Sequence, residues 1–358
     1  MSTIELRWND YSLSEEQEDV RSMLQDFFTR NSPSTLVREA EPLGFDADLW
    51  QRMDKSGLVS LAMGEPYGGQ GGGLVELVLA AVEVGRTLAP VPFIEHTVAT
   101  RLLGSLWGDA AEERLSDAVT GELVIAFAPS AAQRGRTLVP GGAIARAVVA
   151  LDGDDLVLLR RDTPPEQATN QAHAPVAWWD ATDEETTREV LASGEAAHTA
   201  WNTALAEWKV ATAASLSGLA AGALQLARTF ATERIAFGSP IAKFQAVSHQ
   251  LVDIHMAVES MRHLALKAAW FTENEPAARP ELPSMALAHA SRATTKAVAD
   301  AVHLHGGLGI TLEADVSLYY QRAAVWGQLA GGTRADIETI SAAIDRIAAR
   351  HTPSEEIR

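Results

Sequence analysis

The residues best suited to bind a ligand lie between Arg234 and Gln245. Arg234 supplies a planar fork of donors for a phosphate, Phe237 offers a face to an aromatic ring, and Gln245 carries a hydrogen-bonding amide. Together these groups could clamp an adenine dinucleotide. Taken alone, the segment is better explained by an arginine that satisfies the carbonyls at a helix end beside a packed phenylalanine.

A pair of glycines further along the chain strengthens the ligand-binding interpretation. Gly306 and Gly307 leave the backbone bare, so that it can approach a pyrophosphate closely. His303 and His305 form a His-x-His pair just before them, but residues two apart on a helix point in different directions. No third ligand stands at metal spacing, so we expect no metal site.

Long segments with one apolar face must position these residues. Helical periodicity predicts helices at residues 14–31, 49–57, 74–88, 94–107, 202–233, 245–271, 285–304 and 335–350. Ser14 and Gln17 have the spacing of a capping box, and the glycine-rich stretch from Gly64 to Gly73 predicts an irregular loop.

The middle of the chain has a different pattern. Short β-rich runs at residues 123–127, 147–151 and 156–159 predict a small sheet, whereas residues 162–195 are acidic and weakly patterned. We therefore expect a mainly α protein with a small β domain. Its three parts would span residues 1–118, 119–200 and 201–358.

Composition excludes several classes of function. The chain of 358 residues carries a net charge of −18, which would repel nucleic acids and anionic membrane surfaces. The absence of cysteine excludes disulfides, cysteine-ligated metals and thiol catalysis. The acidic start lacks a signal-peptide pattern and predicts a cytoplasmic protein. The uncharged run Val210–Ala227 could cross a bilayer by length, but its small residues favour a buried helix.

In their order and spacing, these segments resemble the acyl-CoA dehydrogenase family. The N-terminal stretch agrees, with Ser14–Gln17, the Glu65-Pro-Tyr-Gly-Gly loop and Glu83–Pro92. The resemblance covers residues 11–107 and 205–348. It implies an N-terminal helical domain, a middle β domain and a C-terminal four-helix bundle that forms the oligomer core. The implied reaction removes two hydrogens from Cα and Cβ of an acyl-CoA thioester, with FAD accepting a hydride.

The resemblance also implies a set of cofactor ligands. In this family, the arginine and phenylalanine contact the ADP half of an FAD that belongs to a neighbouring subunit. His303 stands where the family usually has glutamine, and Thr333 matches a threonine whose hydroxyl faces the cofactor. The residues implied to bind FAD are Arg234, Phe237, Gln245, His303, Gly306, Gly307 and Thr333.

The chain departs from the family where the catalytic base should stand. The family's usual base is the glutamate of a Glu-Gly-Thr motif, and this position is Gly331 here. Some relatives carry the base on the preceding long helix, and counting back from Arg234 reaches Trp208, one residue beyond Glu207. A one-residue offset rotates a side chain by about 100° around a helix. We therefore expect Glu207 to be a solvated or ion-paired acid, and we assign no catalytic residue.

The middle domain is reduced as well. The family's Thr-Glu-Pro segment is replaced by Phe127–Ser130, with no Gly-Ser-Asp after it. The pair Trp178 and Trp179 is expected to pack in the fold rather than to stack on a flavin ring. The middle domain, which would hold this chain's own flavin, thus lacks the family's motifs. The C-terminal segments that would reach a neighbour's flavin keep them.

This asymmetry is typical of the short subunits of actinobacterial α2β2 acyl-CoA dehydrogenases, which act on steroid side-chain or other bulky acyl-CoA substrates. The expected partners are an acyl-CoA, a homologous subunit with the catalytic glutamate, and an electron-transfer acceptor protein. Two alternatives stay open: a self-sufficient homotetramer that uses Glu207 as a displaced base, and a structural or regulatory paralogue without flavin.

Overall fold

The computed structural model describes residues 12–329 and 332–351. Its N-terminal part is helical, as predicted, and Ser14 and Gln17 form the expected capping box. Two short helices, α2 and α6, were not predicted. The helices of this part are α1 (Glu15–Asn31), α2 (Ser34–Glu39), α3 (Ala47–Lys55), α4 (Leu74–Arg86), α5 (Phe93–Trp107) and α6 (Ala111–Val119).

A four-stranded sheet follows, in the order β1-β3-β4-β6. β1 runs parallel to β3, and the other neighbours are antiparallel. The buried, apolar runs of β3 and β4 form its centre, because both faces of these strands are covered by protein. The strands are β1 (Ile125–Phe127), β3 (Ala147–Asp152), β4 (Asp155–Arg160) and β6 (Thr187–Ser193).

A separate antiparallel pair joins β2 (Arg136–Val139) to β5 (Ala177–Asp180). The sequence predicted neither β2, β5 nor β6. Trp179 on β5 is fully buried and donates a hydrogen bond from Nε1 to the carbonyl of Gly142 at 3.0 Å, so its predicted packing role is confirmed. Trp178 is half exposed beneath the Arg136 guanidinium.

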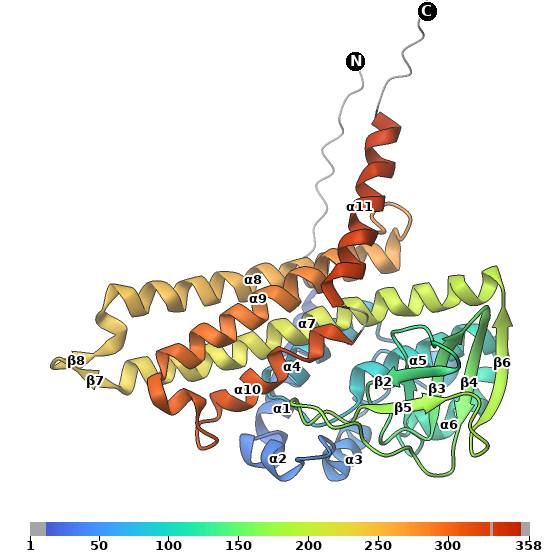
Figure 1. The fold of residues 1–358 in the computed structure, drawn as a ribbon, viewed down its shortest axis with the longest axis horizontal. Helices are drawn as coiled ribbons and strands as arrows, with labels where there is room; N and C mark the ends of the chain where they lie inside the picture. The colour runs from blue at the N-terminus through green and yellow to red at the C-terminus, as the bar shows by residue number, and fades with distance from the viewer. Residues whose placement is uncertain (1–11, 330–331, 352–358) are drawn as a thin grey trace, which may run out of the picture.

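Three long helices run side by side in the C-terminal part: α7 (Glu195–Glu233), α8 (Gln245–Asn274) and α9 (Leu282–Leu304) (Figure 1). α10 (Val316–Ala323) and α11 (Gly332–His351) pack on α9. The predicted buried helix is confirmed, since 78% of the most apolar window of α7 is buried within the protein. α7 begins at Glu195, ahead of the start at 201 that we predicted for the third part.

Glycines allow α4 and α7 to cross closely. A Cβ added at Gly85 would lie 1.8 Å from the carbonyl oxygen of Ser215, and one at Gly218 would lie 1.9 Å from that of Val82. No side chain fits at such distances, so both crossing points require glycine. This close packing fixes the N-terminal helices against the bundle. The mainly α fold with a small β part is as predicted.

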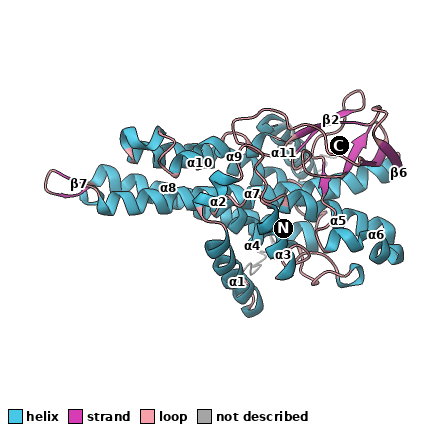
Figure 2. Cartoon of the chain, turned by 90° about the horizontal axis from the view of Figure 1, so that it is seen from below, coloured by secondary structure: helices cyan, strands magenta, loops and turns pink. Residues whose placement is uncertain are grey.

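A hairpin joins α7 to α8 and extends beyond the end of the bundle (Figures 1 and 2). It pairs β7 (Ile235–Ala236) with β8 (Ser239–Pro240). Phe237 and Gly238 form its tip, and both have positive φ angles, of 51° and 80°. This backbone matches the tight turns typical of two-residue hairpins, which a non-glycine residue adopts at a cost. Five short 3-10 turns complete the described fold: η1 (Glu65–Tyr67), η2 (Gly108–Ala110), η3 (Ile241–Lys243), η4 (Gly306–Ile310) and η5 (Trp326–Gln328).

Candidate functional site

A hollow of about 400 Å³ lies at the hairpin end of the bundle. It brings together three of the predicted ligands, Arg234, Gly306 and Gly307, from segments far apart in the sequence. Arg234 caps α7, where its backbone N–H donates to the carbonyl of Phe230 at 2.8 Å. Its carbonyl accepts from the N–H of Ile241 at 2.9 Å, which ties the hairpin back to the helix end.

Gly306 and Gly307 leave one side of this hollow without side chains. No described atom lies within 4 Å of a Cβ added at Gly306 or Gly307, and Gly306 has a φ of 62°. The backbone is therefore bare on this side and accessible to a phosphate group. The exposed guanidinium of Arg234 at the rim supplies the positive charge that such a group requires.

His305 also lines the hollow, and the sequence did not predict this role. Its ring stacks on Phe230, with ring centroids 4.6 Å apart, and its Nδ1 donates to the carbonyl of Ala301 at 2.8 Å. Because that carbonyl can only accept, the Nδ1 atom carries the proton. His305 directly precedes the two glycines, which was the available sequence signal. His303 is exposed at the end of α9 and is not among the lining residues.

Phe237 is 97% exposed at the hairpin tip, where its ring meets that of Phe244 edge-on at 6.1 Å. An aromatic side chain so fully in solvent has no packing role within this chain. Further exposed apolar side chains lie on the hairpin and around η4: Ile235, Leu308, Ile310 and Leu312. Several exposed large apolar side chains at one end of a molecule are typical of an interface with another protein.

The remaining predicted ligands do not line the hollow. Gln245 is the exposed first residue of α8, and Thr333 is half-buried at the start of α11. Gly331, where the family's base would stand, lies outside the described residues.

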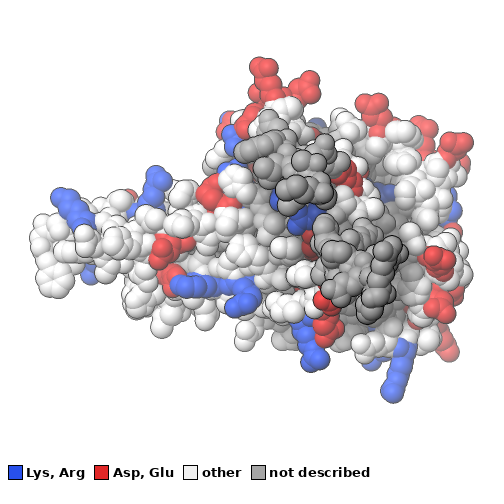
Figure 3. All heavy atoms as spheres, turned by 90° about the horizontal axis from the view of Figure 1, so that it is seen from above, with Lys and Arg blue, Asp and Glu red and all other residues white. Residues whose placement is uncertain are grey.

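Charge is unevenly distributed over the molecule. Figure 3 shows many acidic side chains over the end that carries the sheet, whereas the hairpin end bears mainly basic ones on this face. The net charge of −18 is therefore not evenly spread over this face.

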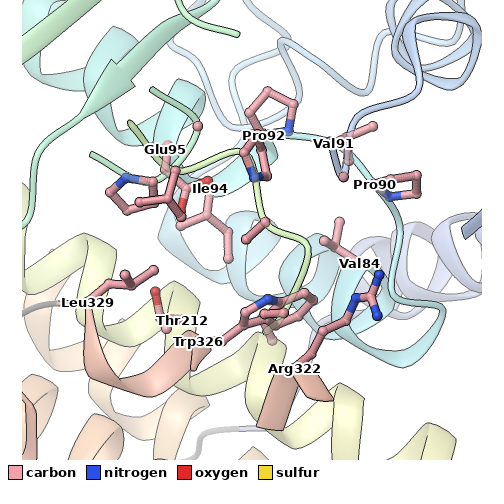
Figure 4. A pocket seen from close by; sticks show the side chains of 18 of the residues that line it. Val84, Pro90, Val91, Pro92, Ile94, Glu95, Thr212, Arg322, Trp326 and Leu329 are labelled. Atoms are coloured by element: carbon pink, nitrogen blue, oxygen red, sulfur yellow. The ribbon is translucent and has the colours of Figure 1, made fainter. Parts of the chain in front are cut away.

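A second, interior cavity lies between α5, α7 and η5 (Figure 4). Its volume is about 100 Å³, and its lining includes Trp208, Trp326 and Leu329. Pockets for drug-sized ligands and cofactors hold roughly 300 to 1,000 Å³. The cavity is therefore too small for a flavin ring and a thioester together.

Trp208, the residue that we reached by counting back from Arg234, lines this cavity. Glu207 lies on another side of α7, in the wall of a separate groove near the glycine-rich loop. There it accepts two hydrogen bonds from Arg101, at 2.8 and 3.0 Å. Burial alone would lower the pKa of Arg101, but the carboxylates of Glu207, Glu273 and Glu76 together outweigh burial and the pKa is raised. Glu207 is thus an ion-paired acid, as predicted.

The segment Phe127–Ser130 is tied to the protein interior. The Ser130 hydroxyl donates to the carbonyl of Leu329 at 3.0 Å, and the Ser130 carbonyl accepts from the Thr137 hydroxyl at 2.9 Å. These bonds connect the sheet region to the segment before α11.

Comparison with known proteins agrees with this geometry. Residues 14–115 match the acyl-CoA dehydrogenase N-terminal domain, and residues 199–344 match the C-terminal domain of the same family. The acyl-CoA dehydrogenase IpdE2 of Mycolicibacterium smegmatis is 29% identical over 93% of this chain and 100% of its own length.

Two solved structures have the same fold. A variant of the Tcur3481-Tcur3483 steroid ACAD is 25% identical with a TM-score of 0.83, and the match covers 94% of this chain and 100% of that one. The ChsE4-ChsE5 complex from Mycobacterium tuberculosis also has a TM-score of 0.83, at 22% identity, over 97% of this chain and 100% of that one. The two domain matches and these likenesses show that the chain belongs to the acyl-CoA dehydrogenase family.

Proposed function

We propose that this chain is a subunit of a heteromeric, FAD-dependent acyl-CoA dehydrogenase and completes the flavin site of a homologous partner. The partner would supply the catalytic carboxylate, and the assembly would be α2β2. One observation carries the proposal: the ligand groups at Arg234 and Phe237 face outward, whereas the interior cavity has only about 100 Å³. Such a chain can give ligands to another subunit, whereas the cavity beside Trp208 is too small to hold a reaction site.

The hollow at the hairpin end fits part of an FAD molecule. Arg234 would bind the phosphate oxygens, and the bare backbone at Gly306 and Gly307 would let the pyrophosphate approach. Phe237 would cover an aromatic ring of the cofactor, which explains its position in solvent. When bound, FAD supplies the hydride acceptor for dehydrogenation. Gln245, His303 and Thr333 stay predicted ligands.

The relatives support a proposal for the substrate class. One structural relative is titled a steroid ACAD, and we propose that the assembly acts on a steroid side-chain or other bulky acyl-CoA. An electron-transfer protein would accept the electrons. The cytoplasmic location predicted from the sequence is part of the proposal.

The decisive experiment is to express the chain alone and together with a homologous subunit that carries the catalytic glutamate. We expect the lone chain to be colourless and inactive, and the co-purified complex to be yellow and to oxidise an acyl-CoA with an artificial electron acceptor. A lone chain that holds stoichiometric flavin and turns over an acyl-CoA would support the self-sufficient homotetramer. A complex without flavin would support the structural or regulatory paralogue.

A further inference from the structure

One histidine in the hollow at the hairpin end keeps a ring nitrogen for a ligand. The half-buried imidazole of His305 lines this hollow. Its ring stacks on Phe230 at an interplanar angle of 27°, and its Nδ1 atom donates to the carbonyl of Ala301 at 2.8 Å. These two contacts fix the ring and use Nδ1 within the protein. The Nε2 atom has no hydrogen-bond partner among the described residues, so it is the atom that a ligand can bind.

The protonation of this ring decides what Nε2 can bind. Because Nδ1 carries the hydrogen in the neutral ring, Nε2 is then an acceptor. An ionised phosphate oxygen is also an acceptor, so it forms no hydrogen bond with the neutral ring. Only the protonated ring donates from both nitrogens. A phosphate group beside Nε2 therefore favours the imidazolium form of His305.

No carboxylate among the described residues lines the hollow, so an imidazolium would have no acidic partner there. Arg234 on α7 is the charged side chain in the lining. On α9, Asp300 is paired with Lys296 at 2.5 Å. The other titratable side chains near this end lie outside the lining: Arg228 and Glu233 on α7, Lys243 on η3, His303 on α9, and Glu313 and Asp315 after η4. The negative charge that a protonated His305 requires must come from the ligand.

We propose that His305 takes up a proton from solvent when a pyrophosphate group binds in the hollow, and that its Nε2–H then donates to a phosphate oxygen. The inference rests on the proposed function, because it takes FAD as the ligand. It adds that flavin binding to this chain is coupled to pH. The pyrophosphate diester of FAD stays fully ionised near neutral pH, so the proton is added to the protein and not to the ligand.

This coupling makes the affinity for FAD depend on pH. If binding takes up a proton, a higher proton concentration must strengthen binding by the same coupling. A hydrogen bond to a charged group contributes roughly tenfold or more to affinity, and protonation is partial at each pH. We therefore expect FAD to bind at least about fivefold more tightly at about pH 6 than at about pH 8.

The test uses the co-purified complex after its flavin has been removed. Titration with FAD at the two pH values, followed by flavin fluorescence, gives the ratio of affinities. Calorimetry in two phosphate-free buffers of different ionisation enthalpy counts the protons taken up. Binding of FAD without proton uptake would overturn this inference and leave the proposed function standing, whereas a complex that binds FAD at neither pH would contradict both.

Variants assign the proton to His305. His305→Phe keeps an aromatic ring against Phe230 and removes both nitrogens, so the pH preference and the proton uptake should disappear. His305→Gln places an amide donor there at every pH, so its affinity should be the same at both pH values. His263→Gln, exposed on α8 and outside the hollow, is the matched control and should behave like the native chain.

An undiminished pH preference in His305→Phe would refute the role of His305. If that variant does not assemble, the lone chain is titrated with ADP-ribose, a pyrophosphate diester that lacks the flavin ring. The imidazole resonances of the native chain then report whether His305 becomes protonated as ADP-ribose binds. ADP-ribose that binds without protonating His305 would equally overturn the inference.

Discussion

Arg101 donates two hydrogen bonds to Glu207, from Nε to Oε2 at 2.8 Å and from Nη2 to Oε1 at 3.0 Å. This fork holds Glu207 against α5 and away from the interior cavity, which the neighbouring Trp208 lines instead. A third bond, from Arg101 Nη1 to the carbonyl of Ala62 at 2.8 Å, fixes the guanidinium itself. In this position the Glu207 carboxylate links α7 to α5 through Arg101.

We therefore predict that Glu207→Gln destabilises the chain without removing activity from the complex. The side chains of Glu207 and Arg101 are only 16% and 19% exposed, so the guanidinium would lose its nearest carboxylate at a partly desolvated position. Screening by solvent is incomplete there, and we expect a loss of about 1–3 kcal/mol in the free energy of unfolding. Urea denaturation checks this value, with the exposed Glu233→Gln on the same helix as the control. Turnover that vanishes in folded Glu207→Gln would instead identify Glu207 as a displaced base.

A second prediction concerns pH and His96, which is fully buried in α5. Its Nε2 contacts the carbonyl of Ala118 at 2.9 Å, and its Nδ1 lies 3.2 Å from the N–H of Ile125. Because that N–H must donate, Nδ1 accepts and the ring is neutral. Burial lowers the pKa of His96 from 6.5 to about 4.

The folded state thus takes up the His96 proton less readily than the unfolded state. Stability from this group is complete above pH 6.5 and is lost as the pH falls from 6.5 to about 4, by about 3 kcal/mol in total. Denaturation at a series of pH values should show this loss, and His96→Gln should reduce it while His249→Gln, at an exposed position, should not. An NMR titration that places the His96 pKa near 6.5 in the folded chain would refute the prediction.

Much of the fold could be predicted because its long helices have a regular apolar period. The helix predicted at 74–88 is α4, Leu74–Arg86, and the one predicted at 245–271 is α8, Gln245–Asn274. The short elements were missed for physical reasons. α2 and α6 are too short for a clear period, and β2 and β5 depend on pairing between distant segments. α7 extends back to Glu195 because tertiary packing supports a start that lacks a strong pattern.

The hollow at the hairpin end was easier to predict from the sequence than the interior cavity. Arg234, Gly306 and Gly307 stand in recognisable sequence patterns, and the fold brings them to one hollow. The interior cavity forms only where α5 and α7 meet, and no sequence pattern indicated that its lining residues Glu95 and Thr212 come together.

A third prediction concerns the attachment of α11 to the bundle. Lys209 on α7 lies 2.8 Å from the carboxylate of Asp336 on α11 and donates to the Ser284 hydroxyl on α9 at 3.0 Å. Both charged side chains are at least nine-tenths buried. Removing one partner leaves the other charge buried and uncompensated, which typically costs about 3–5 kcal/mol.

Lys209→Met should therefore lower the free energy of unfolding by about 3–5 kcal/mol and speed hydrogen exchange of the α11 amides. The double variant Lys209→Met with Asp336→Leu should recover much of this loss, because no charge then stays buried. Urea denaturation of the single variants and the double variant measures the coupling. Losses that simply add would show that the two side chains do not interact in solution.

The last prediction separates binding of flavin from stability of the chain. Arg234 is exposed at the rim of the hollow, and its side chain has no hydrogen-bonded or ionic partner among the described residues. Arg234→Ala should consequently leave the unfolding of the lone chain within about 0.5 kcal/mol of the native value. In the complex, the same change removes a charge-assisted contact to a phosphate, worth about 1.5–3 kcal/mol, so flavin affinity should fall by about ten- to a hundredfold. Titration of the apo complex with FAD, followed by flavin fluorescence, measures this effect.

Arg228→Ala, exposed on the same helix and outside the hollow, is the matched control. If Arg234→Ala and Arg228→Ala bind FAD equally well, the outward-facing hollow does not belong to the flavin site.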